Sequence, residues 1–311
     1  MREHSLSTGK KIILTIVGII VALTIVVVGI GTKVYLDVKG SADQAYESVK
    51  RETPAKREKA VDLEEQEPFS ILLLGIDTGD LGRTEKGRSD TIMVATVNPK
   101  DKKTTVVSIA RDTYVSIVGH GTDDKINHAY AFGGAAMSMD TVEKYLDIPI
   151  DHYAAINMKG LKELVDAVGG VQVANSAAFT QNGYTFNHGL NTLDGDMALA
   201  FSRMRKEDPR GDYGRQERQR DIVAGVAKKL LTMDGITKYQ EVLNAMESNV
   251  TTDMHFNDMK KIALNYRDAF TNIKTDQMQG EGFMQDNISY QRVSEGELKR
   301  VQDILKAELG L

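Results

Sequence analysis

The sequence predicts an α/β domain, with a central mixed β-sheet flanked by helices, preceded by one N-terminal transmembrane helix. Short apolar runs bounded by turn residues, such as Phe69–Leu74 before Gly75, indicate buried strands. Apolar residues at helical spacing, with cap residues before them, indicate helices between and after these strands. A separate uncharged run near the N-terminus has the length of a membrane span.

The N-terminal run covers residues 12–30 and contains no charged side chain. At a rise of ~1.5 Å per residue it extends about 28 Å, close to the thickness of a bilayer's hydrocarbon core. Arg2, Lys10 and Lys11 precede it, whereas acidic residues dilute the lysines that follow, which favours a cytoplasmic N-terminus. The alternative is a cleaved signal peptide, but the run is long for one and no small-residue cleavage site follows.

This topology divides the chain into four parts. We expect a short cytoplasmic segment at residues 1–11, a transmembrane helix at 12–32 and an extracytoplasmic stalk or linker at 33–67. The composition changes at Pro68, and residues 68–311 read as one catalytic domain. The localisation expected is therefore the cell membrane, in a single pass, with the C-terminal domain extracytoplasmic.

Local signals place the main elements of the domain. Thr91–Val97 and Thr104–Ile109 are rich in β-branched residues, and the turn between them begins Asn98-Pro99, so they predict an antiparallel hairpin. Four helices are expected, each with a start or spacing signal: one capped by Asn157 and stopped by Gly169-Gly170, one at Asp212–Met233, one at Phe256–Phe270, and one opened by the capping box Ser294-x-x-Glu297 and running toward Leu309.

Composition excludes several classes of function. The formal net charge of −5 argues against nucleic-acid binding, and the lack of cysteine excludes thiolate catalysis and cysteine-ligated zinc. The six histidines show no HExxH spacing, and no G-x-S-x-G motif is present. A zinc enzyme and a serine hydrolase are both disfavoured.

Acidic and basic residues stand at the open end of the predicted hairpin. Asp90 precedes the outgoing strand and Arg111 follows the return strand, so the two should meet. Asp77 follows the strand Phe69–Leu74 and reaches the same edge if that strand runs parallel to Thr104–Ile109. Carboxylates without histidine or cysteine suit a hard cation such as Mg²⁺. An Asp–Arg surface network, or Asp77 acting as a turn former, explains the spacing equally well. Arg88 lies two residues before Asp90, on the loop Thr78–Ser89.

A second basic cluster lies between residues 203 and 220. Arg215 and Gln219 share one face of the predicted helix with Ile222, which should point inward. Guanidinium groups match phosphate oxygens with two parallel hydrogen bonds, so several of them suit a pyrophosphate. A solvated charged face is the alternative, because acidic residues are interleaved. The arginines are Arg203, Arg205, Arg210, Arg215, Arg218 and Arg220.

A set of motifs runs through the chain in a fixed order. The stretches are Leu72-Leu73-Leu74-Gly75-Ile76-Asp77, Gly87-Arg88-Ser89-Asp90-Thr91-Ile92-Met93, Ser108-Ile109-Ala110-Arg111-Asp112-Thr113, Lys125-Ile126-Asn127-His128-Ala129-Tyr130-Ala131, Val168-Gly169-Gly170-Val171, Leu193-Asp194-Gly195, Ala198-Leu199-Ala200, Arg203-x-Arg205 and Gly214-Arg215-Gln216-x-Arg218-Gln219. Through these stretches the sequence closely resembles the LytR-CpsA-Psr family of cell-wall enzymes, over about Phe69 to Leu231. One departure is Ala110, where the family usually has proline.

The resemblance implies a phosphotransferase that moves an anionic glycopolymer, such as a teichoic acid or capsular polysaccharide, from an undecaprenyl-pyrophosphate carrier to a peptidoglycan acceptor at the bilayer. By matching positions, Asp77 and Asp90 would hold Mg²⁺ or Mn²⁺, and Arg88 and Arg111 would act in catalysis. The residues implied to bind the pyrophosphate are Arg88, Arg111, Arg203, Arg205, Arg215 and Gln219. The lipid would lie in an apolar tunnel between sheet and helices. The candidate wall residues are Phe132, Leu161, Leu164, Ile222 and Val226, although a place in the ordinary apolar core is the favoured reading for any single one of them.

The same residues are compatible with other functions. A hydrolase of polyprenyl pyrophosphate would use the same residues with water as acceptor, and a lipid-binding scaffold would keep the pocket without turnover. A non-enzymatic transcriptional attenuator is disfavoured, because no DNA-reading motif precedes the membrane run. No general base is evident. Asp112 is a weak candidate for that role, and the alternative role for it is to orient Arg111.

Overall fold

A six-stranded mixed sheet forms the centre of the protein, as predicted. The computed structural model describes residues 32–51, 56–78, 87–205, 207–232, 239–247 and 249–311. The strand order is β11-β6-β1-β2-β3-β12, in which β1 pairs parallel with β6, and β3 pairs parallel with β12. The other pairs are antiparallel. The strands are β11 (Val250–Thr252), β6 (His152–Asn157), β1 (Phe69–Ile76), β2 (Ser89–Asn98), β3 (Lys103–Ile109) and β12 (Ile273–Gln277).

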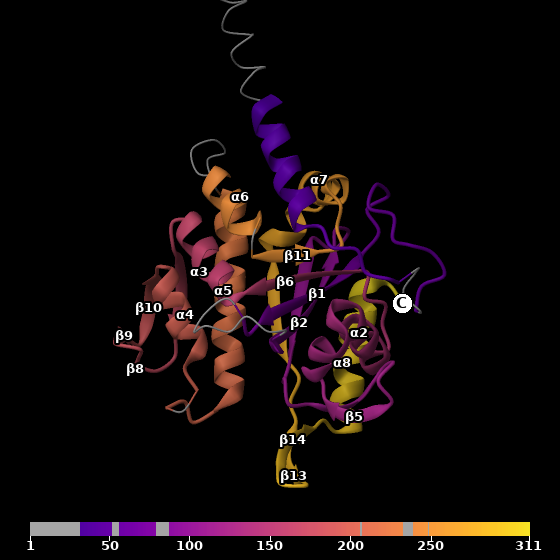
Figure 1. Ribbon diagram of the computed structural model, residues 1–311, viewed down its shortest axis with the longest axis vertical. Helices are drawn as coiled ribbons and strands as arrows, with labels where there is room; N and C mark the ends of the chain where they lie inside the picture. The colour runs from indigo at the N-terminus through magenta and orange to yellow at the C-terminus, as the bar shows by residue number, and fades with distance from the viewer. Residues whose placement is uncertain (1–31, 52–55, 79–86, 206, 233–238, 248) are drawn as a thin grey trace, which may run out of the picture.

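Helices cover both faces of this sheet (Figure 1). One face carries α2 (His128–Leu146) and α8 (Glu295–Leu309); the other carries α3 (Met158–Ala167), α4 (Gly195–Arg203), α5 (Asp212–Thr232) and α6 (Tyr239–Glu247). Leu72, Val94 and Val301 belong to the buried core on the α2–α8 side. Val165 and Phe201 belong to a second core cluster within the α3–α6 layer. The α2–α8 layer thus shares one apolar cluster with the sheet, whereas the α3–α6 layer contains an apolar cluster of its own.

Smaller elements complete the fold. A short 3₁₀ helix, Arg267–Thr271, follows α7, and the β13–β14 hairpin projects at the end of the molecule opposite to the helix of residues 32–45 (Figure 1). Their bounds are β4 (Tyr114–Ile117) paired with β5 (Thr122–Lys125), β7 (Val171–Asn175) with β10 (Gly189–Leu193), β8 (Phe179–Gln181) with β9 (Tyr184–Phe186), β13 (Glu281–Gln285) with β14 (Ile288–Arg292), and α7 (Phe256–Asn265).

The N-terminal region is described only from residue 32. The predicted transmembrane helix at 12–32 therefore lies, except for its last residue, outside the described residues. Among the residues that are described, no helix combines the length and apolar composition that a bilayer crossing requires. Residues 32–45 form a helix that contacts the domain: the Ser41 hydroxyl donates to Glu247 in α6, and the Tyr35 ring meets Phe256 of α7 edge-on at 5.3 Å.

Most of the elements expected from local signals are present. Strands β2 and β3 form the predicted antiparallel hairpin, with Ile92 opposite Ile109. The Asn157 side chain caps α3, and the Ser294 side chain accepts from the backbone N–H of Glu297 at the start of α8. The helix predicted to reach Phe270 is wrong at its C-terminal end, because α7 stops at Asn265 and the chain continues as a 3₁₀ turn.

A β-bulge shapes the edge where β1 and β2 end. Gly75 pairs with Thr91, but Ile76 pairs with Ser89, so Asp90 is the extra residue between the two pairs. Bulges bend a strand and change the direction of a side chain. This irregularity, which the sequence did not predict, places Asp90 beside the end of β1 and therefore near Asp77.

We expect Gly75→Ala to destabilise the domain by about 1–3 kcal/mol, because a Cβ here overpacks a closely paired site. The added atom would lie 2.8 Å from the Thr91 Cβ, which is fixed to the backbone of β2. Gly296→Ala is the matched control, since nothing lies within 4 Å of a Cβ built there. Urea denaturation of both variants measures the effect, and equal midpoints for Gly75→Ala and wild type would contradict it.

Candidate active site

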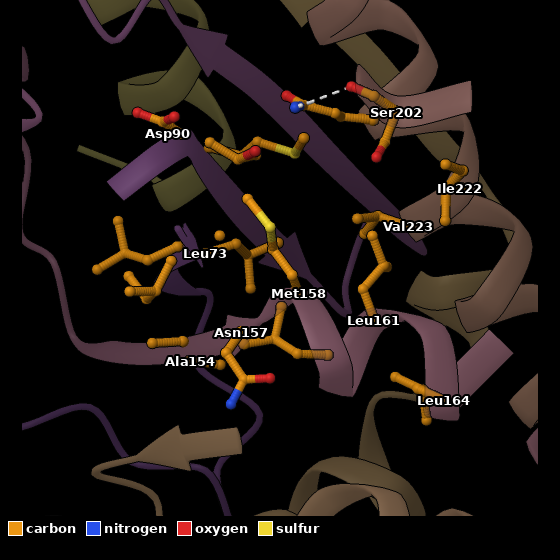
Figure 2. A pocket seen from close by; sticks show the side chains of 18 of the residues that line it. Leu73, Asp90, Ala154, Asn157, Met158, Leu161, Leu164, Ser202, Ile222 and Val223 are labelled. Atoms are coloured by element: carbon orange, nitrogen blue, oxygen red, sulfur yellow. Dashed lines mark hydrogen bonds between the residues drawn. The ribbon is translucent and has the colours of Figure 1, made fainter. Parts of the chain in front are cut away.

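A cavity of about 370 Å³ lies between the sheet and helices α3 and α5. Its body is apolar: Leu73 from β1, together with Leu161 and Leu164 from α3, points into it (Figure 2). Ile222 and Val226 of α5 also line it. Four of the five candidate wall residues thus line the cavity. The expectation for Phe132 was wrong, because its ring stacks on His120 at 3.9 Å and lies exposed at 41%.

One end of this cavity is polar. Asp77 and Asp90 come from the ends of β1 and β2, Arg203 from the end of α4, and Arg215 and Gln219 from the first turns of α5. The parallel relation of β1 to β3, with β2 between them, produces the convergence expected from the sequence. Five of the predicted site residues therefore line one space. The predicted residues that do not line it are Arg88, Arg111 and Arg205.

Arg111 reaches the site through Asp90. Its Nη1 lies 2.7 Å from Asp90 Oδ2, and the side-chain amide of Asn127 lies 3.4 Å from Asp90 Oδ1. Burial acts to lower the pKa of Arg111, but the carboxylates of Asp90 and Asp112 outweigh it, so the pKa is raised. Arg111 stays charged and holds Asp90 at the cavity edge. Only its place in the family motif singles out Asn127 in the sequence.

Arg215 is the buried cation of the polar end. Only 9% of the residue is exposed, and its Nη2 lies 2.6 Å from Asp212 Oδ1. Burial lowers the pKa of Arg215, against the opposing effect of Asp212. Its Nε and the Gln219 Oε1 are buried and make no hydrogen bond within the described part of the chain. Buried polar atoms are normally satisfied, so these two are suited to meet a ligand.

Arg88 is held at the same edge by a chain of polar contacts. The backbone N–H of Asp77 donates to the Arg88 carbonyl at 3.0 Å. The Arg88 Nη1 lies 3.5 Å from His128 Nε2, and His128 Nδ1 lies 2.7 Å from Asp124 Oδ2. An imidazole with its proton on Nδ1 donates to Asp124 and accepts from Arg88 at Nε2. Sequence reasoning dismissed His128 as a scattered histidine, and only the fold brings Asp124 and Arg88 to it.

The carboxylates of the polar end can hold a small cation. Within the described residues, no group of three or more His, Cys, Asp or Glu side chains could hold a metal. Mg²⁺, however, commonly takes one or two carboxylates and completes its shell with water and substrate phosphates. Asp77 and Asp90 supply two such carboxylates at one end of one cavity. The residues therefore fit Mg²⁺ bound together with a phosphate ligand.

The remaining arginines of the basic cluster have different roles. Arg218 is 4% exposed, and its Nη1 pairs with Asp208 at 2.7 Å. Arg220 is 7% exposed and donates to the Ser108 hydroxyl in β3 at 2.8 Å. These two hold α5 against the rest of the domain. Arg205 is exposed outside the cavity, although its charge acts on Arg215. A uniformly solvated face is thus excluded for Arg215, Arg218 and Arg220.

The Asp112 carboxylate contacts two basic side chains. Its Oδ1 accepts from Lys125 Nζ at 2.8 Å, and its Oδ2 lies 3.7 Å from Arg111 Nε. This arrangement matches the orienting role considered from the sequence. It leaves Asp112 poorly placed to accept a proton from a substrate hydroxyl.

Asp221 on α5 carries a destabilising charge at neutral pH. Burial, with a smaller effect of Glu217, raises the pKa of this carboxyl to about 6 from an ordinary 3.8. The folded state thus binds the Asp221 proton more tightly than the unfolded state does. The contribution of this proton to the stability of the fold is therefore full below pH 3.8 and is lost as the pH rises through 6. Allowing for partial solvent exposure, we expect Asp221→Asn to raise stability by about 1 kcal/mol at pH 7.5 and little at pH 4. Urea melts at both pH values measure this, and an equal effect at both would contradict it.

The family and its solved structures match the chain over most of its length. The LytR_cpsA_psr family model matches residues 32–307. The chain is 60% identical over 304 residues to the polyisoprenyl-teichoic acid–peptidoglycan teichoic acid transferase TagU of Enterococcus faecalis, covering 98% of this chain and 99% of that protein. A crystal structure from Enterococcus faecalis, described as a transcriptional regulator, is 47% identical with a TM-score of 0.73, covering 81% of this chain and 91% of the other.

A ligand-bound relative has the same fold. The structure of TagT bound to LIIa-WTA is 29% identical, with a TM-score of 0.72, and the match covers 85% of this chain and all of that one. The family model and the sequence relatives both support the resemblance found in the sequence. The chain belongs to the LytR_cpsA_psr family.

Proposed function

We propose that this protein is a membrane-anchored phosphotransferase that moves an anionic glycopolymer from an undecaprenyl-pyrophosphate carrier to peptidoglycan. One observation carries the proposal: a single cavity joins an apolar body to a polar end containing two carboxylates and two arginines. A polyprenyl pyrophosphate has the same division between an apolar chain and a doubly anionic head. The relative from Enterococcus faecalis is named for this transfer of teichoic acid.

Different residues of the cavity would bind the lipid chain and the pyrophosphate. The polyprenyl chain would occupy the space between Leu73, Leu161 and Ile222, and the pyrophosphate would meet Arg203 and Arg215. An acceptor hydroxyl attacks the phosphorus that carries the glycan, and the bond to the polyprenyl phosphate breaks. Phosphoryl transfer depends mainly on positioning and on neutralising the developing charge, which guanidinium groups do without reorganisation.

Arg88 and Arg111 extend this charge to the rim, where His128 and Asp90 hold them. Mg²⁺ bound by Asp77 and Asp90 would supply further charge neutralisation on the phosphate oxygens. Arg111 would then share Asp90 with the cation.

The proposed location is the outer face of the cell membrane, with residues 12–32 as the anchor and the N-terminus in the cytoplasm. The uncharged run and the basic residues before it support this. Protease added to intact protoplasts is expected to remove the domain of residues 68–311. A domain that stays protected until the membrane is opened would contradict the topology.

The test of function is a reconstitution with two readouts. The purified chain is mixed with a lipid-linked teichoic acid and peptidoglycan fragments, and covalent polymer on the fragments is measured beside released phosphate. Transfer that requires the fragments supports the proposal. Phosphate release without transfer would identify a pyrophosphate hydrolase instead, because the same residues can serve water as the acceptor.

A further inference from the structure

A second hollow of about 370 Å³ adjoins the cavity described above. It lies between α3, α4 and the hairpin of β8 and β9. Met158, Leu199 and Arg203 line both spaces, so these side chains form a common wall between them. The hollow has the size of small-molecule sites, which typically measure roughly 300–1,000 Å³. Whatever binds in it lies directly beside the polar end of the first cavity.

The charge of this hollow opposes that of the chain. Lys159, Lys162 and Arg203 line it against one carboxylate, Asp196, whereas the chain as a whole carries −5. Lys162 pairs with Asp196 at 2.7 Å, and Lys159 lies 3.5 Å from Glu163. Both lysine side chains are about half exposed, so they can turn toward a ligand at little cost. The local excess of positive charge favours an anion.

The rim and floor suit a saccharide. Asn182-Gly183 forms a two-residue turn in which both φ angles are positive, 49° and 82°, and such turns fix the hairpin tightly. This turn presents the Asn182 amide, and the following Tyr184 presents a half-buried ring. The floor contains Leu199 and Ala200. A sugar ring offers an apolar face for an aromatic ring and hydroxyl groups for amide and carboxylate groups.

The hairpin that carries this rim is anchored from below. The ring centroids of Phe179 and Phe186 lie 4.8 Å apart with the rings tilted, and Phe179 stacks on Phe201 of α4 at 5.6 Å. The hairpin that carries the rim is therefore anchored in the packed core by Phe179 and Phe186, which lowers the entropy lost on binding.

We infer that this hollow, defined by Lys159, Lys162, Asn182, Tyr184 and Asp196, binds an anionic saccharide next to the reacting pyrophosphate. The inference rests on the proposed function. Two sources share this chemistry, the donor glycopolymer and the peptidoglycan acceptor. Because Arg203 borders both spaces, a saccharide held here places its linkage or its hydroxyl within reach of the phosphate.

The test is the double variant Lys159→Ala/Lys162→Ala, compared with Lys260→Ala/Lys299→Ala. The control removes two exposed lysines from α7 and α8, and Lys299 pairs with Asp303 at i,i+4 as Lys159 does with Glu163. We expect the KM for one substrate to rise about tenfold, or ~1.4 kcal/mol, with little change in kcat. A rise for the lipid-linked donor alone identifies the donor glycan, and a rise for peptidoglycan fragments alone identifies the acceptor. KM values equal to those of the control for both substrates would overturn the inference.

A binding experiment separates this inference from the proposed function. Calorimetric titration of the full chain with lipid-free teichoic acid and with soluble peptidoglycan fragments needs no turnover. Binding of one of them that is weakened in the double variant supports the hollow as a saccharide site, even if no transfer is detected. Binding of neither overturns the inference, while loss of polyprenyl-pyrophosphate binding in Arg215→Met tests the first cavity independently.

Discussion

Arg215→Met is expected to weaken the binding of a polyprenyl pyrophosphate by about ten- to a hundredfold, because one charge-assisted contact is worth roughly 1.5–3 kcal/mol. Methionine keeps most of the buried volume, so the apolar body of the cavity is preserved. The Nε of Arg215 is buried and makes no hydrogen bond in the described part of the chain, which leaves it available to the ligand. Equilibrium binding of a fluorescent polyprenyl pyrophosphate, together with turnover, measures the loss.

Two further variants make this result specific. Arg210→Ala removes an exposed cation two residues before α5. Arg210 pairs with Asp208 and Glu217 and lies outside the cavity lining. We expect its affinity to remain within about twofold of wild type, since exposed ion pairs contribute little. Arg215→Met/Asp212→Asn removes the partner carboxylate as well and excludes an unpaired Asp212 as the cause. If Arg215→Met binds the lipid as wild type does, the pyrophosphate does not lie at this end.

Asp90→Asn is expected to reduce Mg²⁺-dependent turnover about a hundredfold, because a cation held by Asp77 alone is bound weakly and placed poorly against the phosphate. A second observable is thermal stability. In wild type, Mg²⁺ at a hundred times its Kd should stabilise the fold by about 2.7 kcal/mol, and this gain should largely disappear in the variant.

The ion pair between Asp90 and Arg111 also affects the stability of the variant when no metal is present. Because Asp90 Oδ2 lies 2.7 Å from Arg111, we expect Asp90→Asn to lose about 1 kcal/mol in EDTA. Asp112→Asn is the matched control: it also removes a carboxylate beside Arg111 but lies outside the cavity lining, so it should keep the Mg²⁺ stabilisation. Equal Mg²⁺ shifts in wild type and Asp90→Asn would rule out a shared metal.

Local signals were sufficient for the parts of the fold that depend on neighbours in sequence. The turn beginning Asn98-Pro99 joins two β-branched runs, and the hairpin follows from these alone. The convergence of Asp77 with Asp90 required only one further assumption, that β1 runs parallel to β3, and this is correct. Helix α2 was not predicted, because Gly133 and Gly134 interrupt its helical geometry and break the apolar periodicity.

Spacing could not separate the arginines of the basic cluster. Arg215 and Arg218 are three residues apart on one helix, and both are buried. Arg215 lines the cavity, whereas Arg218 is enclosed by Asp208 and the rings of Phe179 and Phe201. That difference depends on segments distant in sequence. Periodicity also cannot predict the contacts of His128 or the bulge at Asp90, because each depends on the register or packing of another element.

The two faces of strand β1 differ in how well they tolerate substitution during evolution. Leu72 faces the core and is fully buried, whereas its neighbour Leu73 faces the cavity and is already partly exposed. Shortening a core side chain opens a new void and typically costs about 2–5 kcal/mol, but a residue that borders an existing void loses fewer contacts when it changes. Alternate positions of one strand are thus under different selective constraints. Mutations at the cavity-facing positions can alter which lipid carrier is accepted while the fold stays above its stability threshold.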